Sequence, residues 1–222
     1  MSVLSALTND LDWRETEIAS MRILLSSGSA TPSQQTVLLR AAWALLYAHY
    51  EGFCKNALVI FFDAVCKSGV LGENLPRSTR LFALASTLRK LRGMPDHEVL
   101  VELENFVPLY LRKTPVFPDV DTKSNLWPNV LIELMESADL CTDKVIENRS
   151  KLHTLVARRN KIAHGENSII PELSYYKSYE DAVYDVIYDL ACQIEARLQG
   201  GALCFIHLSL LRYVALFQSA SK

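Results

Sequence analysis

An arginine and a histidine, Arg159 and His164, stand five positions apart near the end of one predicted helix. Histidine has a reference pKa of about 6.5, so it exchanges protons near neutral pH, and the planar guanidinium of arginine matches two phosphate oxygens at once. RNA cleavage without a metal needs a base for the 2'-hydroxyl proton, an acid for the leaving 5'-oxygen and a cation for the phosphorane charge. One Arg and one His supply only part of this. A two-fold dimer with the pair at its axis supplies two of each.

The stretch Leu152 to Glu166, LHTLVARRNKIAHGE, must position this pair. Arg159 lies on the apolar stripe of the expected helix, whereas Arg158 does not. Because an unpaired buried guanidinium costs on the order of several kcal/mol, Arg159 must face either an internal carboxylate or a surface meant for an anion. Gly165 predicts a helix end in the left-handed conformation. The other stripe residues, which we expect to be buried, are Leu152, Leu155, Val156, Ile162 and Ala163.

The spacing alone is weak evidence, because Arg92 and His97 repeat it with a Gly-Met-Pro run between them, where no helix presents the pair. Structural interpretations also exist for the first pair. His164 in a last helical turn stabilises the helix dipole by about 0.3 to 1 kcal/mol. Arg159 can form a structural ion pair with Glu51 or with an acid in 181–189, and Asn160 can be an ordinary helix residue.

The apolar periodicity predicts helices along the whole chain, and no stretch shows the alternating pattern of a strand. The stretch from Ser33 to Lys67 is apolar nearly all round, so this helix is expected at the centre of the fold. Its aromatic residues and His49 are predicted to lie in the core. Glu51 is expected either to pair with Lys55 on the surface or to orient Arg159 or His164 through its carboxylate. Four further helices are expected over Ser5–Leu25, Thr79–Leu91, Glu98–Asn105 and Asn125–Ala138. The next helix is expected to start at a Thr142 or Asp143 cap, with Glu147 in the reciprocal position, and to end at Gly165. The last is expected from Ser174 or Ser178 to Leu198.

The fold class is therefore all-α, an up-and-down bundle packed on a long central helix. With 222 residues the chain forms one large domain or a domain with an accessory hairpin. We expect a helical domain over residues 1–199. Residues 200–222 form an apolar C-terminal segment in which Ala202–Phe217 packs on the core or binds a partner.

Composition narrows the class of protein further. The net charge of -2 excludes a globally basic nucleic-acid binder, so a polyanion site must be local. Such a cluster exists: Arg149, Lys151, Arg158, Arg159 and Lys161. The five cysteines form no CxxC and no Cys/His cluster, which predicts no metal, no cofactor and a reducing cytoplasm. The N-terminus is unlike a signal peptide, and charged residues interrupt both long apolar stretches, so no membrane span is expected.

Three stretches also carry a family resemblance: RRNKIAHGE, WALLYAHYEGFCKNAL and TKSNLWPNVL. They resemble HEPN domains, which are all-α proteins marked by Arg, four to six residues and His, and in particular the prokaryotic RiboL-PSP-HEPN or MAE-type branch. The resemblance spans about Trp43 to Glu166. It implies the fold predicted above.

The resemblance further implies a metal-independent endoribonuclease, acting as a homodimer on RNA, and typical of the toxin of a toxin–antitoxin pair or of a phage-defence effector with a possible antitoxin partner. By resemblance, Arg159, Asn160 and His164 occupy the catalytic motif positions. We expect substrate contacts from Arg158 and Lys161. The alternative is a helical RNA- or nucleotide-binding module without turnover. His97, His153 and His207 receive no role, and for Tyr175, Tyr176 and Tyr179 helix packing competes with base stacking.

Overall fold

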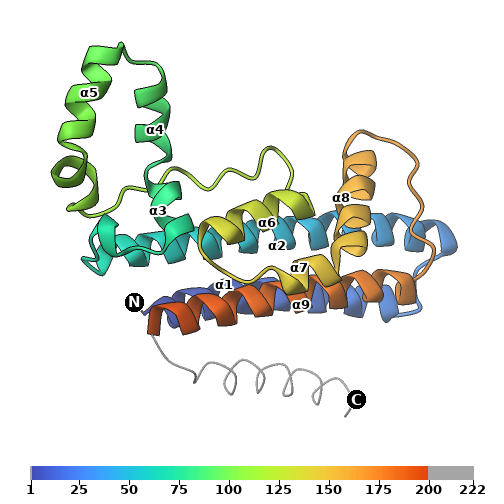
Figure 1. Cartoon of the computed structure of the whole chain (residues 1–222). Helices are drawn as coiled ribbons and strands as arrows, with labels where there is room; N and C mark the ends of the chain where they lie inside the picture. The colour runs from blue at the N-terminus through green and yellow to red at the C-terminus, as the bar shows by residue number, and fades with distance from the viewer. Residues whose placement is uncertain (1, 200–222) are drawn as a thin grey trace.

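The computed structural model describes residues 2–199, and all regular structure in this range is helical (Figure 1). The all-α class is therefore confirmed. The α-helices are α1 (Val3–Ser26), α2 (Pro32–Lys67), α3 (Arg77–Ala83), α4 (Ala85–Arg92), α5 (Asp96–Glu104), α6 (Pro128–Ser137), α7 (Asp143–Glu147), α8 (Arg149–Ala163) and α9 (Leu173–Gln199). Two short helical turns, η1 (Gly72–Asn74) and η2 (Val107–Leu111), complete the described chain.

Helix α2 is the centre of the fold, as predicted. It is 36 residues long, and it begins with a capping box between Thr31 and Gln34 and with Pro32 in the first turn. It packs against α1, α9, α8 and α6. Because neighbours surround it, its aromatic side chains are all buried: Trp43, Tyr47, Tyr50, Phe53, Phe61 and Phe62. The element that carries Glu51 is thus held on several sides.

Helix α8 is held against α2 by apolar contacts and by one buried hydrogen bond. The Trp43 Nε1–H donates to the carbonyl of Leu155 at 3.0 Å, and Leu152, Leu155 and Val156 are fully buried. Gly165 has φ +78°, so the predicted left-handed end is confirmed. The predicted stripe is too long, however, because Ala163 is exposed and only its neighbour Ile162 packs on the core.

Each of two stretches that is predicted to form one helix forms two helices in the structure. Residues 77–92 break at Leu84 between α3 and α4, and residues 143–163 break at Asn148 between α7 and α8. The side chain of Thr142 makes no cap hydrogen bond, so the predicted capping box is wrong. Instead, the Asn148 side-chain amide donates to the carbonyl of Lys144 at 3.1 Å. The break lets α7 pack on α9 and α6 while α8 turns to meet α2.

Two helices also begin at residues other than the predicted ones. Helix α6 begins at Pro128, later than expected, because Trp127 precedes a proline and is extended, with ψ 152°, so the helix cannot start before it. Helix α9 begins at Leu173, just before the predicted serine starts.

Helices α4 and α5 and the turn η2 form an arm that rises from one end of the molecule, while α8 rises at the other (Figure 1). None of these three elements contains a buried residue. Glu102 ties the arm together, since its carboxylate accepts from Lys90 Nζ at 3.0 Å and from the Tyr110 hydroxyl at 2.7 Å. Large apolar side chains remain exposed on it, at Leu100, Val101, Leu103, Val107 and Leu109.

The segment from Ala202 to Phe217 lies outside the described residues, so its predicted packing stays a prediction. Among residues 2–199, no helix is both long enough and apolar enough to cross a membrane.

Candidate functional site

The guanidinium of Arg159 lies between α8 and α2 on three partners. Its Nη2 donates to the carboxylate of Glu51 at 3.4 Å, and its Nη1 donates to Asn160 Oδ1 at 2.9 Å. The ring of Tyr47 lies beneath it, 3.7 Å from Cζ to the ring centroid. The side chains of Arg159 and Glu51 are 23% and 22% exposed, so the ion pair is reachable from solvent.

These contacts hold the guanidinium in place without using all of its N–H donors. An arginine has five N–H donors, and the two bonds to Glu51 and Asn160 use two of them. The contact to Glu51 is also at the long end for a charge-assisted hydrogen bond. Arg159 thus keeps donors for an incoming anion while its position is set by the protein.

Tyr47 is a rigid and neutral support for Arg159. Burial, and to a smaller extent the nearby Glu51 carboxylate, raise the pKa of its phenol to about 12. Its hydroxyl accepts from the backbone N–H of Leu126 at 2.9 Å, which also anchors the loop before α6. Tyr47 and Glu51 are four residues apart on α2, so one face of α2 presents both to Arg159. That spacing is a sequence signal for Tyr47 that the motif alone did not reveal.

The last turn of α8 places Asn160 and His164 next to each other along the helix. The carbonyl of Asn160 accepts from the backbone N–H of His164 at 2.9 Å, and the side-chain oxygen of Asn160 accepts from Arg159. The imidazole of His164 is exposed at the helix end. Asn160 therefore connects the two motif residues, with its main chain bonded to one and its side chain bonded to the other.

The predicted cations divide between two sides of α8. Arg158 Nη1 donates to the carbonyl of Ile169 at 2.8 Å, and its guanidinium lies over the rings of Trp43 and Tyr175, at 5.6 Å and 5.0 Å from their centroids. Arg40 Nη2 likewise donates to the carbonyl of Glu166 at 3.0 Å. These two arginines hold the loop after α8, away from Arg159. Lys161 is exposed.

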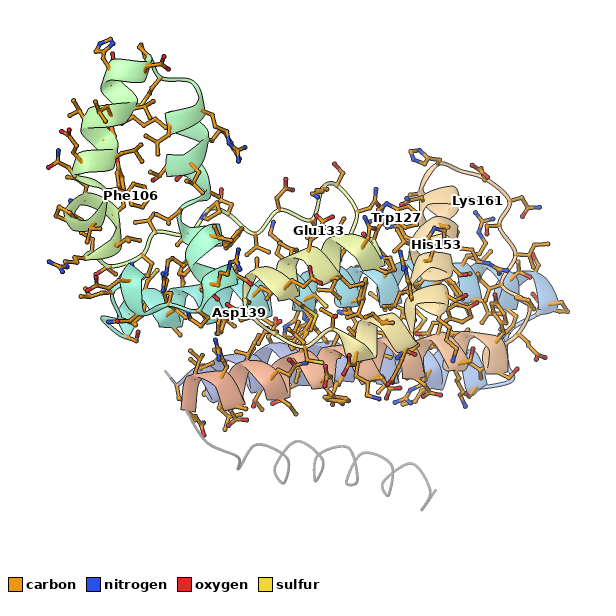
Figure 2. All side chains as sticks on the ribbon, viewed as in Figure 1. Phe106, Trp127, Glu133, Asp139, His153 and Lys161 are labelled. Carbon is orange, nitrogen blue, oxygen red and sulfur yellow. The ribbon has the colours of Figure 1, made fainter. Side chains whose placement is uncertain are left out.

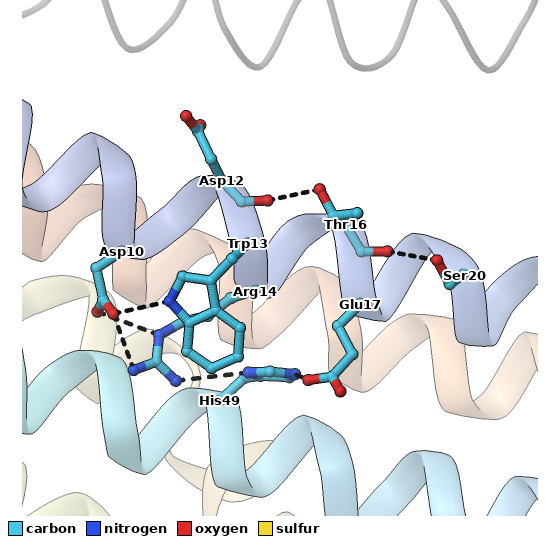
Figure 3. A network of polar contacts seen from close by, with 8 residues as sticks. All are labelled: Asp10, Asp12, Trp13, Arg14, Thr16, Glu17, Ser20 and His49. Carbon is cyan, nitrogen blue, oxygen red and sulfur yellow. Dashed lines mark hydrogen bonds and ion pairs between the residues drawn. The ribbon is translucent and has the colours of Figure 1, made fainter.

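His49 belongs to a different network, between α1 and α2 (Figure 3). It is 3% exposed, and its Nε2 lies 2.8 Å from the carboxylate of Glu17. Its Nδ1 lies 3.5 Å from Nη1 of Arg14, which is itself held by Asp10. The prediction of a core histidine is confirmed. The expected Glu51–Lys55 surface pair is replaced by the contact of Glu51 with Arg159.

Within residues 2–199, no group of three or more His, Cys, Asp or Glu side chains is arranged to hold a metal ion. The last turns of α8 carry a guanidinium that contacts an amide and a carboxylate, and an exposed imidazole at the helix end. Their chemistry is anion binding and proton transfer.

A sequence model of the HEPN_MAE_28990-like HEPN proteins matches residues 3–201. The chain belongs to this HEPN family. The match confirms the predicted family and extends it well beyond Trp43 to Glu166. HEPN proteins are generally nucleases or RNA-binding proteins. Searches among curated proteins and among solved structures found no match.

Proposed function

We propose that this HEPN protein is a metal-independent endoribonuclease that cleaves RNA by attack of the 2'-hydroxyl on the adjacent phosphodiester. The products are a 2',3'-cyclic phosphate and a 5'-hydroxyl. The observation that carries the proposal is the half-buried Arg159, which is held by Tyr47, Asn160 and Glu51 and still has free donors a short distance along α8 from an exposed histidine.

Arg159 is assigned to the phosphate. A catalytic cation is most effective when the protein fixes it before the substrate arrives, because no reorganisation is then needed as charge develops in the transition state. Stacking on Tyr47 and the bond to Asn160 supply this fixation. Asn160 completes the site by keeping the guanidinium and the end of α8 in register.

His164 is assigned to proton transfer, and Lys161 to the phosphate of a neighbouring nucleotide. Arg158 serves the RNA indirectly, by holding the loop after α8. One His164 performs one proton transfer, so a homodimer with the motif at its axis supplies the second.

The charge of α8 supports a polyanionic substrate. No Asp or Glu occurs from Arg149 to Gly165, although the whole chain carries a net charge of -2. Contacts with phosphates supply most of the non-specific affinity for a nucleic acid. We assign the protein to the toxins of toxin–antitoxin or phage-defence systems, acting on cytoplasmic RNA under the control of a partner protein.

A second candidate function is RNA or nucleotide binding without turnover. The Arg159–Glu51 contact favours it, because the carboxylate already partly neutralises the guanidinium and gives Arg159 a structural role.

Cleavage of total cellular RNA by the purified protein in EDTA decides between the two. We expect the wild type to cut, and Arg159→Ala and His164→Ala to lose at least about a hundredfold in rate. The matched control is Arg92→Ala/His97→Ala, since this pair repeats the spacing without the helix. Circular dichroism must show equal helix content in all variants. RNA that is bound but never cut favours the binding module, and equal cutting by all variants rejects the catalytic assignment.

A further inference from the structure

Two aromatic rings from distant parts of the chain meet at the junction of α6 and α8. Trp127, which immediately precedes α6, and His153 of α8 have ring centroids 4.8 Å apart and planes inclined by 44° (Figure 2). Trp127 packs partly on the core, while His153 is exposed. The rings are tilted and Trp127 is only partly buried, so the pair is reachable from solvent.

The position of Trp127 is fixed relative to Arg159 by a single side chain. The face of the Tyr47 ring supports the Arg159 guanidinium at 3.7 Å, and the hydroxyl of the same ring accepts from Leu126 N–H, one residue before Trp127. The backbone N–H of Trp127 donates to the carbonyl of Asn125 at 2.9 Å, which shapes the turn into α6. The tryptophan is therefore built into the same framework as the candidate phosphate site.

His153 lies on the same face of α8 as Asn160 and His164, whereas Arg159 lies about 120° round the helix, against α2. Residues 149, 153, 157, 160 and 164 follow the spacing of one helix face. Of these, Arg149, His153 and His164 are exposed. Ala157, between the two histidines, has only a methyl side chain. His153 and His164 are three turns apart, about 16 Å along the axis. This face carries cationic or titratable groups at both ends and no carboxylate.

We propose that Trp127 and His153 form a stacking site for one unpaired base of single-stranded RNA whose backbone follows this face of α8 towards His164. The inference rests on the proposed function for the identity of the ligand, and it adds a subsite that the motif does not contain. Every base offers a π-face, so stacking on aromatic side chains binds single strands with little sequence preference. A paired base is already stacked within its helix, so the subsite selects unpaired RNA.

The test measures binding of a fluorescein-labelled, eight-nucleotide single-stranded RNA to the full chain, in a His164→Ala background that leaves the RNA intact. We expect Trp127→Leu, which keeps an apolar group against the core, to weaken binding about tenfold, and Trp127→Phe to restore it. His153→Ala should weaken binding in the same direction. His97→Ala, an exposed histidine on the arm, is the matched control and should bind as the parent does.

Two further readouts separate stacking from a merely structural role. Placing one abasic nucleotide at each position in turn should weaken binding to the parent at one position, and Trp127→Leu should be insensitive at that same position. Trp127→Leu should also leave the salt dependence of binding unchanged, whereas Arg149→Ala should reduce its slope by about one. Equal binding by Trp127→Leu and the parent, equal losses at every abasic position, or no binding of any oligonucleotide by the parent would overturn the proposal.

The outcome is independent of the nuclease assignment. If the RNA is never cut but the abasic position and Trp127 are coupled, the stacking site stands and catalysis fails. If the wild type cuts RNA and Trp127→Leu has the same kcat/KM and the same affinity, catalysis stands and the stacking site fails.

Discussion

Arg159 shows how one residue combines a structural and a chemical role. Its contact with Glu51 is long, at 3.4 Å, and both side chains remain partly exposed, so solvent weakens the attraction. Stacking on Tyr47 does not depend on that carboxylate. We therefore regard Glu51 as a positioning residue that directs the guanidinium, at the expense of some affinity for an anion.

Replacing Glu51 by Gln should accordingly affect turnover and binding in opposite directions. Loss of the charge-assisted bond loosens Arg159, which should lower kcat about tenfold, the equivalent of about 1.4 kcal/mol. Removal of the negative charge should leave RNA affinity equal or higher, so KM should not rise. Steady-state cleavage of a short RNA measures both. Lys55→Gln, one turn further along α2, is the control, and an unchanged kcat in Glu51→Gln would reject this role.

Glu180 offers a second residue-scale prediction, between α9 and α1. It is 3% exposed, and burial raises the pKa of its carboxyl to about 7, although Arg22 lies 3.1 Å away and opposes the shift. The folded state then binds the proton more tightly than the unfolded state, where the pKa is near 4.5. The contribution of Glu180 to stability should therefore be fully present below about pH 4.5 and should be lost as the pH rises through about 7.

The variant Glu180→Gln should lack this dependence. Its stability relative to the wild type should improve between pH 5 and pH 8 by on the order of 2 to 3 kcal/mol, the equivalent of a shift of about two units. Urea unfolding at several pH values measures the difference. Asp181→Asn removes the same charge from an exposed neighbour and should show no comparable trend. Parallel pH profiles for wild type and Glu180→Gln would contradict the prediction.

At this scale the sequence was informative about which residues matter and silent about their partners. The apolar stripe predicted that Arg159 needs a carboxylate or an anion, but Glu51 and the acids of 181–189 remained equal candidates. The choice depends on how α8 lies against α2, which is a tertiary fact. The pairing of Trp127 with His153 is equally invisible in the sequence, because no local spacing relates the two rings.

At the scale of the elements, the contact of α1 with α2 depends on a glycine inside a helix. A Cβ on Gly52 would lie 2.8 Å from Nη1 and 3.3 Å from Cζ of Arg14. That guanidinium cannot easily move, because Nε and Nη2 each donate to Asp10 at 3.1 Å and the network with His49 surrounds it (Figure 3). The close approach of a buried arginine explains a residue that otherwise weakens a helix.

Gly52→Ala should therefore destabilise the protein by about 1 to 3 kcal/mol, although the same change at an open helical position gains up to about 1 kcal/mol. Urea unfolding followed by circular dichroism measures the change. In an Arg14→Ala background the clashing atoms are gone, so Gly52→Ala should become neutral or stabilising. If the sign is the same in both backgrounds, Arg14 is not the reason for the glycine.

Helix existence was predictable at this scale because the apolar periodicities are long, and α2 was placed correctly in the centre. The breaks at Leu84 and Asn148 were not, because local propensity allows a continuous helix in both places. The chain turns at Asn148 so that α7 meets α9 and α8 meets α2. Such changes of direction follow from packing between elements and not from the residues at the break.

At the scale of the whole molecule, stability is distributed unevenly between the bundle and the arm. The bundle buries its side chains around α2, whereas α4, α5 and η2 bury none. Leu155→Ala should therefore cost about 2 to 5 kcal/mol, and Leu100→Ala, at 59% exposure, less than about 0.5 kcal/mol. Urea unfolding of the two variants compares them directly. A large loss from Leu100→Ala would mean that the arm is covered in solution.

The proposed nuclease requires a second copy of the chain, and mixing inactive subunits tests this requirement. If Arg159 and His164 from two subunits surround one phosphodiester, an Arg159→Ala subunit paired with a His164→Ala subunit retains one of each. Such mixed dimers should recover a small part of the activity that each variant lacks alone, because the shared site again holds both a cation and one proton-transfer group, although the second histidine is missing. The mixture is refolded together from urea, so that subunits exchange before the assay.

Light scattering sets the condition for interpreting that mixture. We expect a mass of twice 25.0 kDa at micromolar concentration for the wild type and for both variants. Recovery with a dimeric mass places the two motif copies in one shared site. A dimer without recovery means that one Arg159 and one His164 from different subunits are not sufficient for cleavage. A monomer that still cuts RNA means that a single α8 provides the whole reaction, with one imidazole taking part in both proton transfers.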